Sequence, residues 1–172
     1  MLDFNPRGRS LVSRGRSGSL AVVIGEGRLV LLEVETKPGA SPSPGDRMRL
    51  SGADGPGEAR VVGRVEYRRL PRHVQNLVGG IIEQIVRSSE ERFVDYVNRA
   101  GPVSQRAHAL EMIPGVGSTV FRVILEERER APFSSYADIE ERTGLRDPAG
   151  RLAERMTEEV EGRTRVSLFA QR

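Results

Sequence analysis

The sequence predicts an α+β fold, with a small N-terminal β-barrel followed by an all-helical domain. Short apolar runs separated by glycine- and proline-rich turns fill the chain as far as Leu70, which is typical of strands in hairpins. From Arg72 onward the apolar residues recur every three or four positions, which is the spacing of one helix face. The length of 172 residues suits one domain or two small ones.

The first 18 residues are basic and poor in apolar side chains. The tetrapeptide RGRS occurs twice, at residues 7–10 and 14–17, with glycine and serine between the like charges. Such a segment has too little apolar content to fold alone, so residues 1–18 are expected to form a flexible arm. The arm either wraps nucleic acid or is a solvated tail. Its candidate phosphate-binding residues are Arg7, Arg9, Arg14 and Arg16.

Residues 19–71 are expected to form the β domain. Its β-like runs are residues 20–25, 29–35, 46–50 and 59–70. A five-stranded barrel of the oligonucleotide-binding (OB) type fits this pattern, and so does any small twisted sheet. In the last run Arg64 and Arg68 are an even number of residues apart, so both should point to the same side of the strand. One face of the strand is therefore predicted to be basic. The candidate nucleic-acid-binding residues here are Arg60, Arg64, Arg68, Arg69 and Arg72, with Tyr67 as the aromatic residue best placed for base stacking.

Residues 72–162 are expected to be helical. An apolar stripe runs from Val74 to Val86, and a second helix is predicted to start at Ser88, with Glu91 completing a capping box. It ends before the Gly101–Pro102 break. The apolar spacing from Val103 to Ile113 then predicts a further helix.

The stretch IPGVG, Ile113 to Gly117, connects that helix to the next, which Ser118 is expected to cap. Gly115 and Gly117 lack Cβ atoms and can adopt positive φ, so the backbone N–H groups at the start of the second helix could approach a phosphate closely. Val116 would point inward. The candidate binding residues of this turn are Gly115, Val116, Gly117, Ser118, Thr119 and Arg122.

A degenerate second copy of the turn follows around Gly144, with Arg146 where the first copy has its second glycine. Ser135 and Asp138 form a capping pair before it, and Asp147 precedes the next helix. We interpret this copy as structural support. Residues 163–172 then resemble a closing strand that could pair with the β domain.

The composition offers little for catalysis. The chain has no cysteine, and its two histidines lie on separate predicted helices without the spacing of a metal site. We therefore expect no catalytic residue, no metal and no cofactor, and a protein that is not an enzyme.

No apolar run approaches the ~20 residues of a membrane span, so a soluble, cytoplasmic protein without membrane contact is expected. Lys37 is the only lysine, and the excess of positive charge lies in the first 80 residues.

The segment from Leu110 to Leu145 resembles a helix-hairpin-helix motif, although Thr119 and Phe121 stand where such motifs usually place a basic and a small residue. Nearly end to end, the chain is similar to the archaeal family called domain of unknown function 655. That resemblance implies an OB-like β domain joined to a helix-hairpin-helix domain, and a presumed nucleic-acid-binding role.

From the residues and the resemblance we expect a non-enzymatic protein that binds RNA, or with slightly less support DNA, through its phosphate backbone and with little sequence specificity. The alternative is an interaction scaffold that contacts ribosomal or RNA-polymerase-associated proteins. A hairpin used only for packing also remains open, and an accessory of a nuclease is a more distant possibility.

Overall fold

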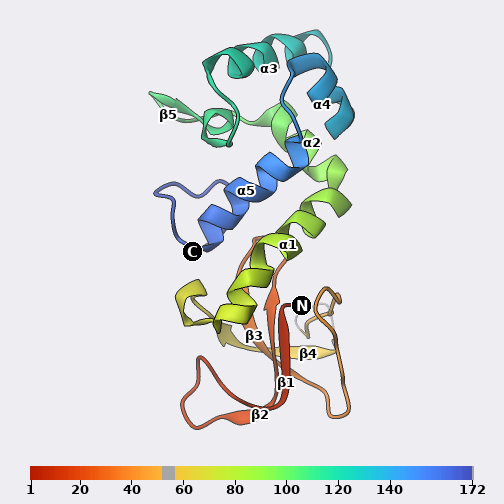
Figure 1. The fold of residues 1–172 in the computed structure, drawn as a ribbon, viewed down its shortest axis with the longest axis vertical. Coiled ribbons are helices and arrows are strands. Elements are labelled where there is room, and N and C mark those ends of the chain that lie inside the picture. The colour runs from red at the N-terminus through yellow and green to blue at the C-terminus, as the bar shows by residue number, and fades with distance from the viewer. Residues whose placement is uncertain (52–56, 172) are drawn as a thin grey trace. The chain divides into compact units, whose positions relative to one another are not determined.

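The computed structural model describes residues 1–51 and 57–171, and it divides into two compact units (Figure 1). The first unit comprises Met1–Ile81 together with Glu159–Arg172, and the second comprises Ile82–Glu158. The turn expected at residues 51–58 lies largely outside the described residues. Within the described part of the chain, no helix has the length and apolar character needed to cross a membrane.

The first unit contains an antiparallel sheet whose strands pair in sequence order. The strands are β1 (Asp3–Arg9), β2 (Ser17–Ile24), β3 (Leu31–Thr36) and β4 (Ala59–Arg64). The α+β class is therefore confirmed. The sheet is not closed into a barrel, because β1 and β4 do not pair in the described structure. The run at residues 46–50 is not a strand, and only Leu50 forms a bridge, with Ala59.

The expectation of a flexible arm over residues 1–18 is wrong, because these residues form the first hairpin of the sheet. Phe4 pairs with Ala21 along the β1–β2 ladder. The loop after β1 is fixed by Glu33 of β3, whose carboxylate accepts hydrogen bonds from the Ser10 hydroxyl and from the Leu11 N–H, the latter at 2.7 Å. The local composition gave no sign of these bonds, since their acceptor lies more than 20 residues away.

The predicted basic face of β4 is also wrong, because a β-bulge interrupts the strand. Arg60 lies opposite Glu35 and Arg64 opposite Leu32, with a register shift between these pairs. Glu35 and Leu32 point to opposite sides of β3, so the two arginines lie on opposite faces of the sheet. Arg68 is not on the strand at all, since Tyr67–Arg69 form a 3₁₀ turn, η1.

One face of the sheet packs on a small apolar core. Its buried members come from the N-terminus and from β2, β3 and β4: Met1, Ala21, Val23, Val34 and Ala59. Phe4, Leu32, Met48 and Leu50 pack around them. Residues 46–50, although not a strand, thus still contribute apolar side chains to this core.

The C-terminal residues do not form the expected strand, but they do return to the sheet unit. The buried carboxylate of Glu159 accepts hydrogen bonds from three consecutive N–H groups, those of residues 168–170, each at 2.9 Å. The Gln171 N–H then donates to the carbonyl of Arg28 at 3.0 Å. A bend around one carboxylate therefore replaces a strand ladder.

The helices are α1 (Arg72–Ser88), α2 (Glu90–Arg99), α3 (Ser118–Arg130), α4 (Tyr136–Thr143) and α5 (Pro148–Val160). Side chains from the last four bury an apolar core in the second unit; its members include Phe93, Val97, Ile124, Ile139, Leu152 and Met156. The predicted cap at Ser88 is wrong. Ser89 precedes α2, and the Ser88 hydroxyl instead donates to the Ile85 carbonyl at 3.2 Å.

The helix predicted from Val103 to Ile113 is absent. The chain there forms a short hairpin of β5 (Pro102–Ser104) and β6 (Ala107–His108), followed by a 3₁₀ turn, η2 (Ala109–Met112). The apolar spacing gave a wrong helix prediction because Val103, which is 41% exposed, does not belong to the core. The second unit is therefore not purely helical.

Candidate nucleic-acid interface

The turn from Ile113 to Gly117 leads into α3 and contains a glycine in the left-handed conformation. Gly115 has φ +84°, a region that strongly favours glycine. Val116 is buried as predicted, and its N–H donates to the Ile113 carbonyl at 3.0 Å. Gly117 has φ −79° and ψ 175°, which any residue can adopt, so the expectation of a positive φ there is wrong.

The N-terminus of α3 is open to solvent. Gly117 occupies the N-cap position, and Ser118 is the first helical residue rather than the cap. Residues 117–119 are exposed, and the first turn of α3 contains no acidic side chain. Because the first N–H groups of a helix have no partner within it, this end carries partial positive charge suited to an anion.

An arginine that the sequence analysis missed lies against this turn. A Cβ atom placed on Gly115 would lie 3.2 Å from Arg151 Nε and 3.3 Å from its Cδ. The Arg151 side chain comes from α5, is 43% exposed and pairs with Glu154 at 3.2 Å. It gives the turn a nearby cation, whereas the sequence next to Gly117 offers none. Arg122, the predicted cation on α3 itself, is exposed.

The second copy of the turn differs in one decisive respect. Gly144 ends α4 with φ +72°, and Leu145 is buried, much as in the first copy. At the start of α5, however, the Asp147 carboxylate accepts a hydrogen bond from the Gly150 N–H at 3.1 Å. Asp147 also pairs with Arg87 at 3.1 Å. The protein's own carboxylate therefore occupies the place where the first copy leaves a free helix end.

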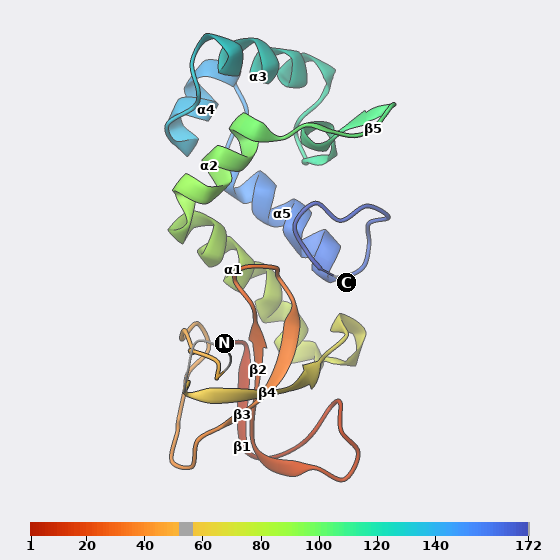
Figure 2. The ribbon, with the colours of Figure 1, turned by 180° about the vertical axis from the view of Figure 1, so that it is seen from behind.

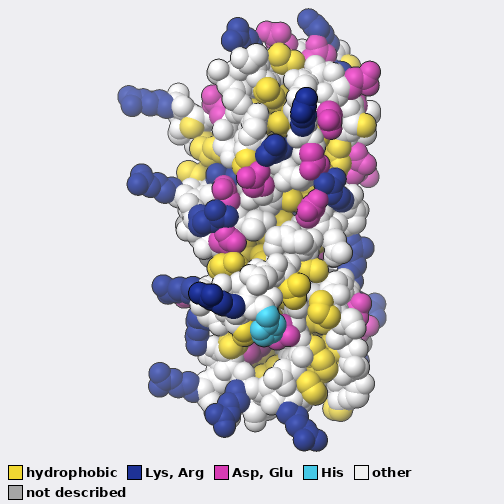
Figure 3. Space-filling model, in the orientation of Figure 1, with side chains coloured by type: hydrophobic (Ala, Val, Ile, Leu, Met, Phe, Trp, Pro, Cys, Tyr) yellow, Lys and Arg dark blue, Asp and Glu magenta, His cyan; other side chains and the backbone are white. Residues whose placement is uncertain are grey.

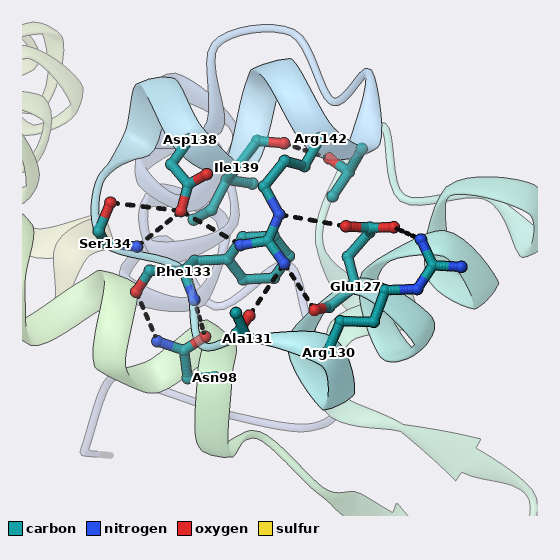
Figure 4. Close-up of polar contacts among 10 residues, drawn as sticks. Asn98, Glu127, Arg130, Ala131, Phe133, Ser134, Asp138, Ile139 and Arg142 are labelled. Atoms are coloured by element: carbon teal, nitrogen blue, oxygen red, sulfur yellow. Dashed lines mark hydrogen bonds and ion pairs between the residues drawn. The ribbon is translucent and has the colours of Figure 1, made fainter.

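Arg142 holds the segment between α3 and α4 (Figure 4). Its guanidinium donates to the carbonyls of Glu127 and Ala131 at 2.6 and 2.9 Å, where α3 ends. It also pairs with Asp138 at 3.3 Å and lies 4.5 Å from the ring centre of Phe133. Arg142 therefore has a structural role at the end of α3.

Two neighbours complete this network (Figure 4). The Ser134 N–H donates to the Asp138 carboxylate at 2.8 Å, and this bond, followed by the charge of Arg142, holds the pKa of Asp138 below its ordinary value. The Asn98 side chain makes two bonds to the backbone of Phe133, accepting at 2.8 Å and donating at 2.9 Å. Together these contacts fix the loop that precedes α4.

The predicted basic residues of the first unit do not form one cluster. Arg16 and Arg60 both bind Glu35, at 2.6 and 3.1 Å, and the hydrogen bond from Arg60 is the main cause that lowers the pKa of Glu35. Arg68 pairs with Glu66 at 2.6 Å. The other predicted arginines of this unit are exposed: Arg7, Arg9, Arg14, Arg64, Arg69 and Arg72. In Figure 3, Lys and Arg side chains project from the sheet unit, whereas acidic and basic side chains are mixed on the helical unit.

Known proteins are similar to this chain over most of its length. The family model described as "Protein of unknown function (DUF655)" matches residues 1–171. The chain belongs to the DUF655 family. It is 28% identical over 137 residues to the uncharacterized protein MJ0038 of Methanocaldococcus jannaschii, a match that covers 80% of this chain and 63% of that protein. The crystal structure of the DUF655 protein Af1531 from Archaeoglobus fulgidus matches with a TM-score of 0.82 and 31% identity, over 99% of this chain and 97% of the other.

In the first unit of this DUF655 chain, a hollow brings together three residues that the sequence predicts to contact nucleic acid. This hollow of about 670 Å³ is lined by Arg64, Tyr67 and Arg68, together with the end of α5 and the C-terminal residues. The Tyr67 hydroxyl donates to Glu161 at 3.0 Å, and burial raises the pKa of Tyr67. The hollow also carries the carboxylates of Glu66, Glu159 and Glu161, which outnumber its two arginines. No group of three or more His, Cys, Asp or Glu residues that could hold a metal occurs in residues 1–51 and 57–171.

Proposed function

We propose that this DUF655 protein binds nucleic acid non-enzymatically by holding a phosphate at the turn from Gly115 to Thr119. The observation that carries the proposal is the contrast between the two glycine turns. Asp147 fills the helix start in the second turn, whereas the first leaves the N-terminus of α3 exposed and without an acidic neighbour in its first turn.

The local charges support an anion as the ligand. The side chain of Arg151 lies against Gly115, and Arg122 is exposed on α3. A guanidinium can bind a phosphate oxygen while the backbone N–H groups of residues 117–119 bind another. Contacts of this kind involve only the backbone of the nucleic acid, so sequence specificity is expected to be low. RNA remains slightly favoured over DNA, and the cytoplasm is the proposed location.

We further propose that the sheet unit, which the family resemblance likens to an OB barrel, contributes exposed arginines such as Arg7 and Arg9 to the same ligand. The alternative of a protein scaffold draws support from the first unit, because Arg16 and Arg60 are engaged by Glu35. In that case both units contact proteins of the translation or transcription machinery.

The test is a salt-dependent titration of the full chain against labelled single- and double-stranded RNA and DNA. Binding through phosphates predicts that the logarithm of affinity falls linearly with the logarithm of salt concentration, by about 0.7 to 0.9 per phosphate contacted. An Arg151→Ala variant should reduce that slope by about one contact, with Glu154→Ala as the matched control for the lost ion pair. Absence of binding at low salt to all four ligands would overturn the proposal.

The sheet is tested separately by reversing Arg7 and Arg9, which are exposed on β1, to glutamate. If the sheet contacts the phosphate backbone, this double variant should bind every sequence more weakly by a similar factor. If its affinity equals that of the wild type while its circular dichroism is unchanged, the sheet does not contact nucleic acid, and the scaffold alternative for the first unit gains support.

A further inference from the structure

The β5–β6 hairpin extends away from the helices of the second unit (Figures 1 and 2). Ser104 pairs with Ala107, which leaves a loop of two residues, Gln105 and Arg106. Every residue from 102 to 106 is exposed, including the apolar Val103 at 41%. An isolated two-stranded hairpin is only marginally stable, so its position depends on what holds its base.

The base of the hairpin is attached to the glycine turn. The Ala109 N–H donates to the Gly101 carbonyl at 3.1 Å and closes the hairpin. His108 then caps η2: its Nδ1 accepts from the Leu110 N–H at 3.2 Å, and its own N–H donates to Glu111 at 3.0 Å. The η2 turn leads directly into residues 113–117.

A ring contact adds a second attachment, to α3. The imidazole of His108 lies 4.9 Å from the ring centre of Phe121, which belongs to the first turns of α3. These contacts connect the base of the hairpin to the N-terminus of α3 and to the turn proposed to hold the phosphate.

The charge of this region suits a polyanion. Between Gly101 and Leu125 the only acidic residue is Glu111, whose carboxylate already accepts the His108 N–H. Arg106 and Arg122 lie in the same stretch, whereas residues 126–129 contain three glutamates. Arg106 and Arg122 outnumber the single carboxylate of this stretch, and an excess of positive charge beside a phosphate site favours further contact with the same nucleic acid.

We propose that the β5–β6 hairpin enters a groove of a nucleic-acid duplex whose backbone is held at the Gly115–Thr119 turn, so that the protein binds duplexes more tightly than single strands. The inference rests on the proposed function of that turn. Groove-binding segments use Arg and Gln to contact base edges and apolar side chains to contact sugars or base steps. Gln105, Arg106 and Val103 supply these groups at and beside the tip of the hairpin.

The experiment compares Arg106→Ala and Val103→Ser with the wild-type chain by fluorescence anisotropy. The ligands are a short labelled duplex of DNA, a duplex of RNA, and the corresponding single strands. Arg99→Ala is the matched control, because Arg99 is an exposed arginine that pairs with Asp95 on α2. Residues 103 and 106 are exposed, so the thermal midpoint of each variant should match that of the wild type.

The expected result for Arg106→Ala is a loss of about tenfold in affinity for at least one duplex, with little change for single strands, since one base-edge contact is lost. Val103→Ser should lower duplex affinity in the same direction, and Arg99→Ala should not. Equal losses on duplexes and single strands, or no loss on either duplex, would overturn the hairpin inference while leaving the proposed function intact. If the wild type binds none of the four ligands, the proposed function itself fails. The two duplexes show whether the groove belongs to DNA or RNA.

Discussion

Replacing Gly117 by aspartate separates stability from binding at the proposed phosphate site. Gly117 is the N-cap of α3, with extended backbone at φ −79°, and no atom outside its immediate chain neighbours lies within 4 Å of where its Cβ would be. Aspartate therefore fits without strain, and its carboxylate can accept a hydrogen bond from an N–H of the first helical turn. Aspartate is a better N-cap than glycine by a few tenths of a kcal/mol, and the helix dipole adds about 0.3 to 1 kcal/mol.

The free energy of unfolding of Gly117→Asp should therefore rise by about 0.5 to 1 kcal/mol. Affinity for nucleic acid should fall by tenfold or more, because the new carboxylate occupies the position proposed for the phosphate and repels it. The two effects have opposite signs, so a loss of binding cannot be attributed to a loss of folded protein.

Urea denaturation and anisotropy titration on the same samples measure both quantities. Gly144→Asp is the matched control, because it adds the same charge to a turn where Asp147 already caps the following helix. Gly144 has φ +72°, so this control should lose about 1 kcal/mol of stability and keep its affinity once the folded fraction is corrected. Wild-type affinity of Gly117→Asp, or an equal loss in both variants, would refute the phosphate contact.

Three further outcomes are expected. Arg142→Ala should lower the free energy of unfolding by about 2 kcal/mol or more, because the carbonyls of Glu127 and Ala131 and the carboxylate of Asp138 lose a charged partner. Arg130→Ala, whose side chain is 72% exposed, should change it by less than about 0.5 kcal/mol in the same denaturation assay. Burial and the charge of Arg128 lower the pKa of His108, while Glu111 opposes them. The folded state therefore favours neutral His108, so stability should be full above the ordinary histidine pKa of about 6.5 and should fall as the pH drops below it, a dependence that His108→Asn should reduce. Deleting residues 1–9 should unfold the first unit, because β1 is lost together with the buried Met1 and Leu2. A truncated chain whose circular dichroism still shows the sheet would show that this strand is dispensable.

The sequence determined the features that depend on neighbouring residues. The period of apolar residues predicted α1 correctly from Arg72, because a helix buries one face whatever covers it. The turn at Gly115 was predictable for a similar reason, since a left-handed position between apolar elements favours glycine, and Val116 is buried as expected. The α+β class followed from the change of period near Arg72.

The tertiary structure alone decided the features that depend on a distant partner. Residues 1–18 have too little apolar content to fold alone, yet Glu33 and β2 supply the bonds that order them. The bulge in β4 depends on its pairing with β3, and it moved Arg60 and Arg64 to opposite faces although their spacing in the sequence is even. Arg151 reaches Gly115 only because α5 packs beside the turn. Periodicity reports which face of an element is buried, whereas the identity of the group that covers it is set by contacts between residues far apart in the chain.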